Sequence, residues 1–169
     1  GMKDLVKNVE MIKGNLKNRI VLDVGCNDGS LLDIFKKKGC KTYGIEPTNA
    51  FKDAKGKGHT IYNQYFDIKS SLYLKKNMKD VDIITFTNVF AHIEDFKDLI
   101  QSLKNLITKN TLIVIENHYF GEVIKKNQFD TFYHEHPRTY SLSSFNKISE
   151  LLGIKILNYN FVKRYNGNF

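Results

Sequence analysis

The chain has 169 residues, 41% of them hydrophobic and 26% charged, which is the composition and size of a single globular domain. Its net charge of +8 comes almost entirely from lysine, whereas nucleic-acid sites typically use arginine for bidentate contacts, so nucleic acid is not the expected partner. No apolar run is long enough to cross a bilayer and the N-terminus lacks a secretion signal, so we expect a cytoplasmic protein that does not span a membrane.

Short β-rich runs alternate along the chain with amphipathic runs. In chain order, strands are predicted over 19–24, 41–46, 60–63, 81–87, 111–116 and 154–157. Helices, with apolar side chains at helical spacing, are predicted over 31–38, 96–107 and 145–152. This alternation predicts right-handed βαβ units and hence one α/β domain over 2–169, a doubly wound, mostly parallel sheet of the Rossmann-like type.

Ligands of such sheets bind beyond the carboxyl ends of the strands, and a glycine-rich loop follows the first predicted strand there. In this loop, Gly25 and Gly29 allow a tight turn and a close approach of the backbone. The spacing is not that of a nicotinamide dinucleotide site, and the loop has no lysine to hold a phosphate. Asp23 and Asp28 would repel a pyrophosphate, but they suit a ligand with an ammonium and a sulfonium group. The loop therefore predicts S-adenosylmethionine as the cofactor, with Asn27 among its contacts.

Polar residues at the ends of the next strands extend the expected cofactor site. Glu46 ends the second strand about 20 residues further on, where an acid accepts the ribose hydroxyls. Asp67 is expected to reach the adenine amino group, and Asn88 either faces the methionyl part of the cofactor or caps a turn. The alternative is structural, with Asp23 capping a turn and Glu46 at a solvated strand end. The pair of acids beside a glycine loop favours the nucleoside site.

Cys26 and Cys40 are the only cysteines. Their spacing fits neither a zinc site nor a disulfide framework, so we expect two reduced thiols.

Four segments occur in a fixed order: 23–30, 44–47, 88–95 and 129–136. The set resembles the C-methyltransferases that act on nucleotide-linked keto-deoxysugars, and the resemblance covers about residues 19 to 145. The first segment is common to many methyltransferases, whereas the last two are more selective. The resemblance implies C-methylation next to a ketone of a nucleotide-linked deoxysugar, with S-adenosylmethionine as the methyl donor.

The segment Tyr133-His134-Glu135-His136 places a phenol, two imidazoles and a carboxylate together. A histidine with a pKa near 6.5 can accept a proton at neutral pH, and a phenol can donate to a developing oxyanion. The resemblance implies that His136 is the general base and that Tyr133 and Glu135 line the reacting sugar. Asn88 and His92 would complete the pocket.

Two other interpretations of this segment remain open. It is either a surface loop with local hydrogen bonds or a metal site, because alternate residues such as His134 and His136 share one side of an extended chain. We expect no metal, since methyl transfer from a sulfonium needs none.

Members of the family usually carry an N-terminal cysteine-rich zinc module and a C-terminal domain that supports the nucleotide-sugar. The sequence contains neither, so we expect a sheet truncated at its last strand, and a partner chain could supply part of the substrate site. Two alternatives stay open. One is a methyltransferase for another small molecule or RNA, and the other is a non-catalytic nucleotide-binding remnant that needs a partner chain.

Overall fold

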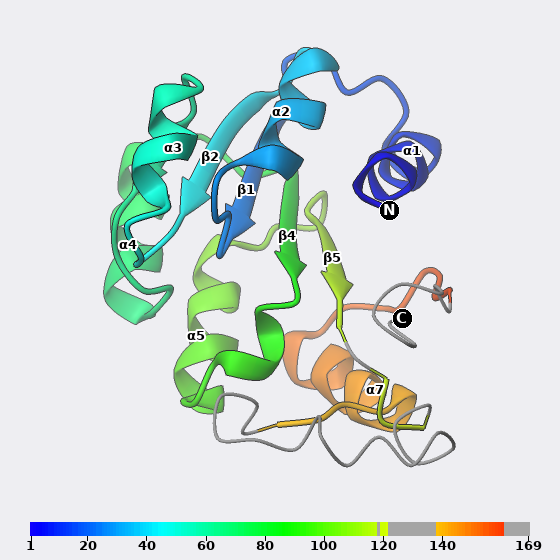
Figure 1. Cartoon of the computed structure of the whole chain (residues 1–169). Helices are drawn as coiled ribbons and strands as arrows, with labels where there is room; N and C mark the ends of the chain where they lie inside the picture. Colours follow the sequence, from blue (N-terminus) through cyan, green and yellow to red (C-terminus); the bar gives the residue numbers. More distant parts are fainter. Residues whose placement is uncertain (118, 122–137, 161–169) are drawn as a thin grey trace.

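A computed structural model describes residues 1–117, 119–121 and 138–160, and in it five parallel strands form one sheet (Figure 1). The strands are β1 (Ile20–Val24), β2 (Lys41–Ile45), β3 (Thr60–Tyr62), β4 (Ile83–Thr87) and β5 (Leu112–Glu116). Their order in the sheet is β3-β2-β1-β4-β5, so the chain winds outward from β1 on one side and from β4 on the other. This confirms the predicted doubly wound fold and puts its topological switch point between β1 and β4.

Helices cover both faces of the sheet. The buried cluster on one face includes side chains of α1 (Met2–Lys13), α2 (Ser30–Lys37) and α3 (Phe51–Gly56). The cluster on the other face includes side chains of α4 (Ile68–Asn77), α5 (Phe96–Leu106) and α7 (Leu142–Leu152). A short 3-10 helix, η1 (Phe90–His92), follows β4. The predicted helices correspond to α2, α5 and α7, whereas α1, α3 and α4 are absent from the prediction.

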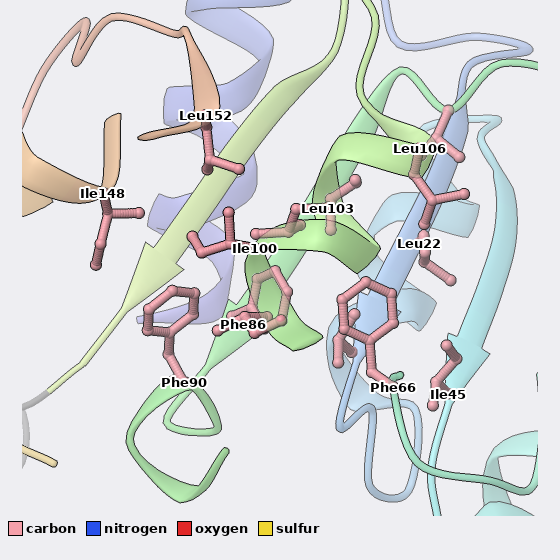
Figure 2. Close-up of a cluster of buried hydrophobic side chains, with 14 of the residues drawn as sticks. Leu22, Ile45, Phe66, Phe86, Phe90, Ile100, Leu103, Leu106, Ile148 and Leu152 are labelled. Carbon is pink, nitrogen blue, oxygen red and sulfur yellow. The ribbon is translucent and has the colours of Figure 1, made fainter. Parts of the chain in front are cut away.

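The alternation of side chains along β1 and β4 decides which residues enter which face. Leu22 and Phe86 join the α4/α5/α7 face, where Phe86 makes edge-to-face contacts with Phe66 at 5.8 Å and Phe90 at 5.3 Å between ring centroids (Figure 2). Val21 belongs to the opposite cluster, against α1 and α2. By the same alternation Asp23, two residues further, points toward the α1/α2/α3 face. A polar residue therefore occupies a position where a strand normally contributes to the core.

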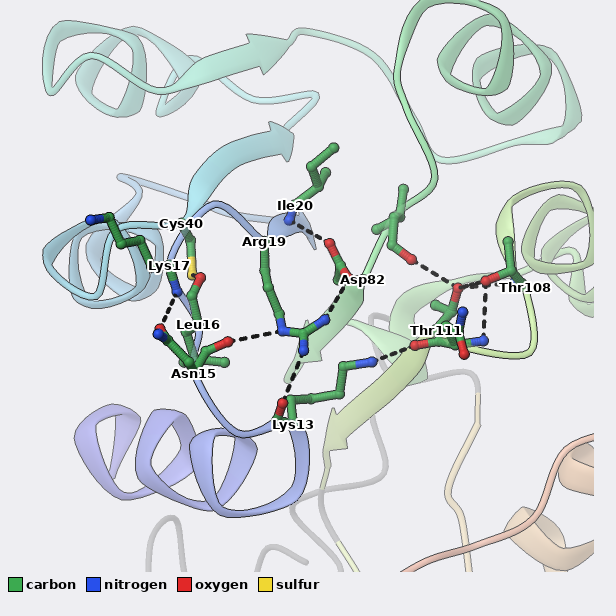
Figure 3. A network of polar contacts seen from close by, with 12 residues as sticks. Lys13, Asn15, Leu16, Lys17, Arg19, Ile20, Cys40, Asp82, Thr108 and Thr111 are labelled. Atoms are coloured by element: carbon green, nitrogen blue, oxygen red, sulfur yellow. Dashed lines mark hydrogen bonds and ion pairs between the residues drawn. The ribbon is translucent and has the colours of Figure 1, made fainter.

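A network of polar contacts closes the amino end of the sheet (Figure 3). The Asp82 carboxylate, just before β4, accepts hydrogen bonds from the Ile20 amide at 2.8 Å and from Nη1 of Arg19 at 2.9 Å. Arg19 also donates to the Lys13 carbonyl at 3.0 Å. These contacts join the end of α1 to the starts of β1 and β4. They lie at the edge of the sheet opposite to the one where ligands of this fold bind.

The predicted strand over 154–157 is wrong, because this segment has irregular backbone in the structure. Ile156 is 37% and Leu157 68% exposed. The segment does not pair with β5, whose partner among the described residues is β4. Instead, it lines a groove of about 660 Å³ together with residues of α1, β5 and α7. Its apolar alternation is that of a strand, but no ladder of backbone hydrogen bonds joins it to another described segment.

The expectation of two reduced thiols agrees with the described residues. Cys26 and Cys40 are both buried free thiols, and the lysines at 36–38 and 75–76 are exposed. Over the same part of the chain, none of the helices has the length and apolarity needed to cross a membrane.

Phe86 offers a test of the core. Replacing it with alanine should lower the free energy of unfolding by about 3–5 kcal/mol, because the change removes a fully buried ring and leaves a cavity. Urea denaturation followed by circular dichroism measures the loss. The control is Tyr65→Ala, which removes a 75% exposed ring and should change stability by less than about 0.5 kcal/mol. Equal effects of the two substitutions would contradict the described packing.

Candidate ligand site at the carboxyl ends of the strands

The loops that follow β1, β2 and β4 meet at the switch point of the sheet. Gly25 and Cys26, directly after β1, donate backbone hydrogen bonds to the Ile45 carbonyl at the end of β2, at 2.8 and 3.1 Å. The Asn27 amide donates to Oε2 of Glu46 at 2.9 Å. The structure therefore brings together three predicted site residues, Gly25, Asn27 and Glu46, within one short stretch of the sheet edge.

The glycines of the loop are required by contacts inside the protein. Gly25 has φ 70°, and a Cβ built on it would lie 2.4 Å from Cγ2 of Val89 in the loop after β4. Gly29 has φ 78°, and its Cβ would lie 2.9 Å from Cδ2 of His59. Both positions thus need the left-handed backbone and the missing side chain. Asn27, with φ 49°, adopts the same conformation between them, so three of the five residues from Gly25 to Gly29 have a left-handed backbone.

Glu46 is held by backbone donors on both of its oxygens. Besides the bond from Asn27 to Oε2, the Thr48 amide donates to Oε1 at 2.8 Å. The residue is 5% exposed, so the alternative of a solvated strand end is wrong. Because each carboxylate oxygen can accept a second hydrogen bond, the fixed carboxylate keeps the capacity to accept from two donors of a ligand.

Asp23 lies buried between the two central strands. Thr85, its Cα partner on β4, donates a hydrogen bond from Oγ1 to Oδ1 of Asp23 at 2.6 Å. The pKa of this carboxyl is raised to about 7, mainly by burial; the hydrogen bond from Thr85 lowers it in part, and the negative charge of Glu46 adds to the rise. A nearby cation would favour the ionised form. The site therefore contains a carboxyl whose charge near neutral pH depends on what is bound beside it.

Asp28 is engaged elsewhere. Its carboxylate accepts hydrogen bonds from Nζ of Lys57 at 2.9 Å and from Oγ of Ser30 at 2.7 Å. The bond from Lys57, with that from Ser30, lowers the pKa of Asp28 to about 2. Its charge is thus balanced by a lysine of the protein, which makes Asp23 the stronger candidate for a cationic ligand.

The remaining predicted residues separate into several environments. Asp67 is the N-cap of α4, and Oδ1 accepts a hydrogen bond from the Ser70 amide at 2.6 Å. Asn88, half-buried with φ 56°, donates its amide to the Glu116 carbonyl at 2.8 Å. His92 ends η1 with its side chain exposed. Tyr133, Glu135 and His136 lie outside the described residues, as does His134 of the metal alternative.

Buried polar groups that the sequence analysis missed lie at the end of β4 and directly after β5. Thr87 is the Cα partner of Glu116, and Asn117, which is 1% exposed, comes next in the chain. Within the described structure, Oγ1 of Thr87 and both amide atoms of Asn117 are buried without a hydrogen-bond partner. Each such group costs about 1–3 kcal/mol, so these atoms are candidates to bond to a ligand. The position of Asn117 just after a predicted strand is the signal that could have identified it.

The described residues contain no group of three or more histidine, cysteine or acidic side chains that could hold a metal ion.

Known proteins are similar to this chain over almost its whole length. It matches the family model described as a methyltransferase domain over residues 2–159. Among curated proteins it is similar to the C-methyltransferase NovU of Streptomyces niveus, with 25% identity over 164 residues. The matched region is 96% of this chain and 38% of NovU, so the chain spans well under half the length of that relative.

Solved structures share the fold at low identity. One is a SAM-dependent methyltransferase from Archaeoglobus fulgidus, at 21% identity and a TM-score of 0.65, covering 95% of this chain and 70% of that one. Another is the magnesium protoporphyrin IX methyltransferase of Synechocystis with bound SAH, at 18% identity and a TM-score of 0.69, covering 98% of this chain and 78% of that one. At these identities the structures show a common Rossmann-like architecture.

The buried carboxyl of Asp23 predicts a pH-dependent stability for the unliganded chain. Its pKa of about 7 lies above the ordinary value of 3.8, so its stabilising contribution is complete below about pH 4 and is lost as the pH rises through 7. Asp23→Asn keeps an acceptor for Thr85 without the charge. Relative to wild type, the variant should gain more than about 1 kcal/mol in unfolding free energy between pH 5 and pH 8.

Urea denaturation at pH 5, 6.5 and 8 measures this gain. Asp80→Asn, which changes an exposed carboxyl, is the control and should run parallel to wild type. A difference between the Asp23 variant and wild type that does not vary with pH would contradict the burial argument.

Proposed function

Because this chain belongs to the methyltransferase domain family, we propose that it transfers a methyl group from S-adenosylmethionine to a carbon next to a ketone, in a nucleotide-linked deoxysugar. The observation that carries the cofactor assignment is the Glu46 carboxylate, buried and fixed by two backbone amides beside the glycine-rich loop. Such a carboxylate suits the two hydroxyls of an unmodified ribose, because both donors can approach oxygens whose directions are already set.

The other polar groups suit the rest of the cofactor. Gly25, Asn27 and Gly29 shape the loop that passes over its nucleoside part, and Asp67 is assigned to the adenine amino group. One oxygen of Asp67 already caps α4, so this contact would use the second oxygen. Asp23 contributes negative charge toward the ammonium and sulfonium groups. Binding of those cations would in turn favour the ionised form of Asp23, since an adjacent opposite charge lowers the pKa of a carboxyl.

The acceptor is assigned from the segments after β4 and β5. When bound, S-adenosylmethionine supplies an electrophilic methyl group on a sulfonium. His136 is assigned as the base that removes a proton from the carbon next to the ketone, which leaves an enolate able to attack that methyl group. Tyr133 donates to the enolate oxygen, Glu135 orients the neighbouring imidazole, and His92 with Asn88 completes the pocket. The likeness to NovU, named as a C-methyltransferase, supports carbon as the acceptor atom.

Two groups, at the end of β4 and directly after β5, extend the acceptor pocket. The buried side-chain amide of Asn117 has a donor and an acceptor atom without hydrogen-bond partners among the described residues. The Thr87 hydroxyl likewise has no partner among them. Hydroxyl and carbonyl groups of a sugar would satisfy both kinds of atom. This pairing would offset the free-energy cost of burying these polar atoms without hydrogen bonds.

Glu46→Ala tests the cofactor site. Loss of the ribose acceptor should weaken S-adenosylmethionine binding by roughly 1.5–3 kcal/mol, or about tenfold to a hundredfold in Kd, which isothermal titration calorimetry measures. Glu10→Ala is a matched control, because Glu10 is an acid in a surface ion pair with Lys38, and should leave Kd unchanged. If the wild-type chain binds no S-adenosylmethionine, the proposed activity is wrong.

His136→Ala tests the base. The substrate is a keto-sugar nucleotide in deuterated water, and the readout is exchange of the proton next to the ketone, by NMR or mass spectrometry. Because general-base catalysis contributes about 10²–10⁴-fold, the variant should exchange that proton slower by this factor while binding the cofactor normally. Equal exchange by the variant, or none by wild type, would contradict the assignment. Exchange abolished by a chelator would favour the metal alternative.

A further inference from the structure

His59 lies between β2 and α2, behind the glycine-rich loop, and has no assigned contact with the ligand. Its ring is 4% exposed and contacts a polar group on each side. Nδ1 lies 2.8 Å from Oγ1 of Thr42 in β2, and Nε2 lies 3.1 Å from Oδ1 of Asp33 in α2. The ring therefore bridges a strand and the helix that follows the loop.

The two partners select one tautomer of the neutral ring. A carboxylate such as that of Asp33 can only accept, so Nε2 carries a proton and donates it to Asp33. Nδ1 then accepts from the hydroxyl of Thr42, which can donate. Both bonds are made by a neutral imidazole in a single tautomer.

The ring also supports the loop directly. Gly29, the N-cap of α2, would place a Cβ 2.9 Å from Cδ2 of His59 and 3.0 Å from the Cβ of Ala54 in α3. The start of α2 thus rests on a surface formed by these two side chains. A change in the position of the ring would move the loop, because closely packed groups cannot absorb it.

A second set of contacts fastens the turn before His59 to the same loop. Nζ of Lys57 lies 2.9 Å from Oδ2 of Asp28 in the loop and 3.7 Å from Oδ2 of Asp33. In the other direction, Nζ of Lys36 in α2 donates to the carbonyls of Lys57 at 2.8 Å and Gly58 at 3.3 Å. The loop and α2 are therefore bound to the segment that runs from Glu46 through α3 to His59, at both ends of that segment.

We propose that His59 is a positioning residue whose neutral ring holds the glycine-rich loop at the separation from Glu46 that S-adenosylmethionine requires. The inference rests on the proposed function. Asn27 fixes one end of the loop on Glu46, and the ring of His59 fixes the other end at Gly29 and Asp33. These two attachments together set the distance between the loop and Glu46.

Protonation of His59 would disturb this arrangement. Nδ1 would become a donor, so the Thr42 hydroxyl would have to turn and accept from the ring instead of donating to it. The charged groups that face the ring are Asp33 and Lys36 from α2 and Lys57 from the turn after α3, and the two lysines oppose a positive ring. Burial, the largest cause, lowers the pKa of His59. Burial and the two lysines favour the neutral form, whereas the Asp33 carboxylate raises the pKa and opposes them.

The test is a measurement of the His59 ring pKa by NMR on the wild-type chain, with and without saturating S-adenosylhomocysteine. The resonance is assigned by its absence in His59→Gln. If the neutral ring favours the bound loop, reciprocity requires that the ligand lowers this pKa; we expect a decrease of about half a pH unit, equivalent to about threefold weaker binding when the ring is protonated. Reading the ring itself separates this effect from the titration of Asp23. An unchanged pKa overturns the inference.

The variant gives the second readout. His59→Gln should raise Kd for S-adenosylhomocysteine by roughly three- to tenfold, as expected for a loop that is no longer held in its binding conformation. Asp82→Asn is the control, since Asp82 stabilises the opposite end of the sheet, and should lower thermal stability without changing Kd. Equal weakening by both variants would show a general loss of stability and overturn the positioning role. Absence of any binding by wild type would overturn the proposed function, whereas normal binding with an unshifted His59 overturns only this inference.

Discussion

The hydrogen bond from the Asn27 amide to the Glu46 carboxylate joins the two segments on which the ligand site depends. It crosses from the loop after β1 to the end of β2, and it requires the left-handed backbone at Asn27 and at both flanking glycines. The loop can then donate from Gly25 and Cys26 to Ile45, which closes it over the sheet edge. A backbone arranged in this way positions an acid without using any other side chain. The backbone therefore forms most of the site, and the same fold that sets the strands also sets the position of the Glu46 carboxylate.

The sequence predicted the parts of this arrangement that depend on local pattern. Runs of β-branched and apolar residues located all five strands, and the rule that ligands bind at the carboxyl ends of strands identified Gly25, Asn27 and Glu46. The residues it missed depend on register. Thr85 matters because it lies opposite Asp23 on another strand, and His59 matters because it packs against Gly29, thirty positions earlier. Neither contact can be predicted from the spacing of residues along the sequence.

The wrong prediction has a related cause. The segment 154–157 has the alternation of a strand, but a strand also needs a partner, and alternation says nothing about pairing. Asp67 shows a second limitation, because one sequence pattern can fit two different roles. Its sequence context, with Ser70 three residues later, is equally compatible with a helix cap, which is the role its Oδ1 fills in the structure. The roles of Tyr133, Glu135 and His136 stay predictions, since those residues lie outside the described structure.

The contact between Gly25 and Val89 has a consequence for how this sequence can evolve. The two residues belong to different loops, yet a Cβ at the first would overlap a methyl group of the second. A larger residue at position 25 would need a smaller one at 89, and would still carry the cost of a left-handed backbone, about 1 kcal/mol relative to glycine. The loop after β4 can therefore diversify at its outer positions, where an acceptor would be recognised. Val89 cannot vary as freely, because its side chain packs against Gly25. In a lineage that changes its acceptor, these two positions should drift together and slowly.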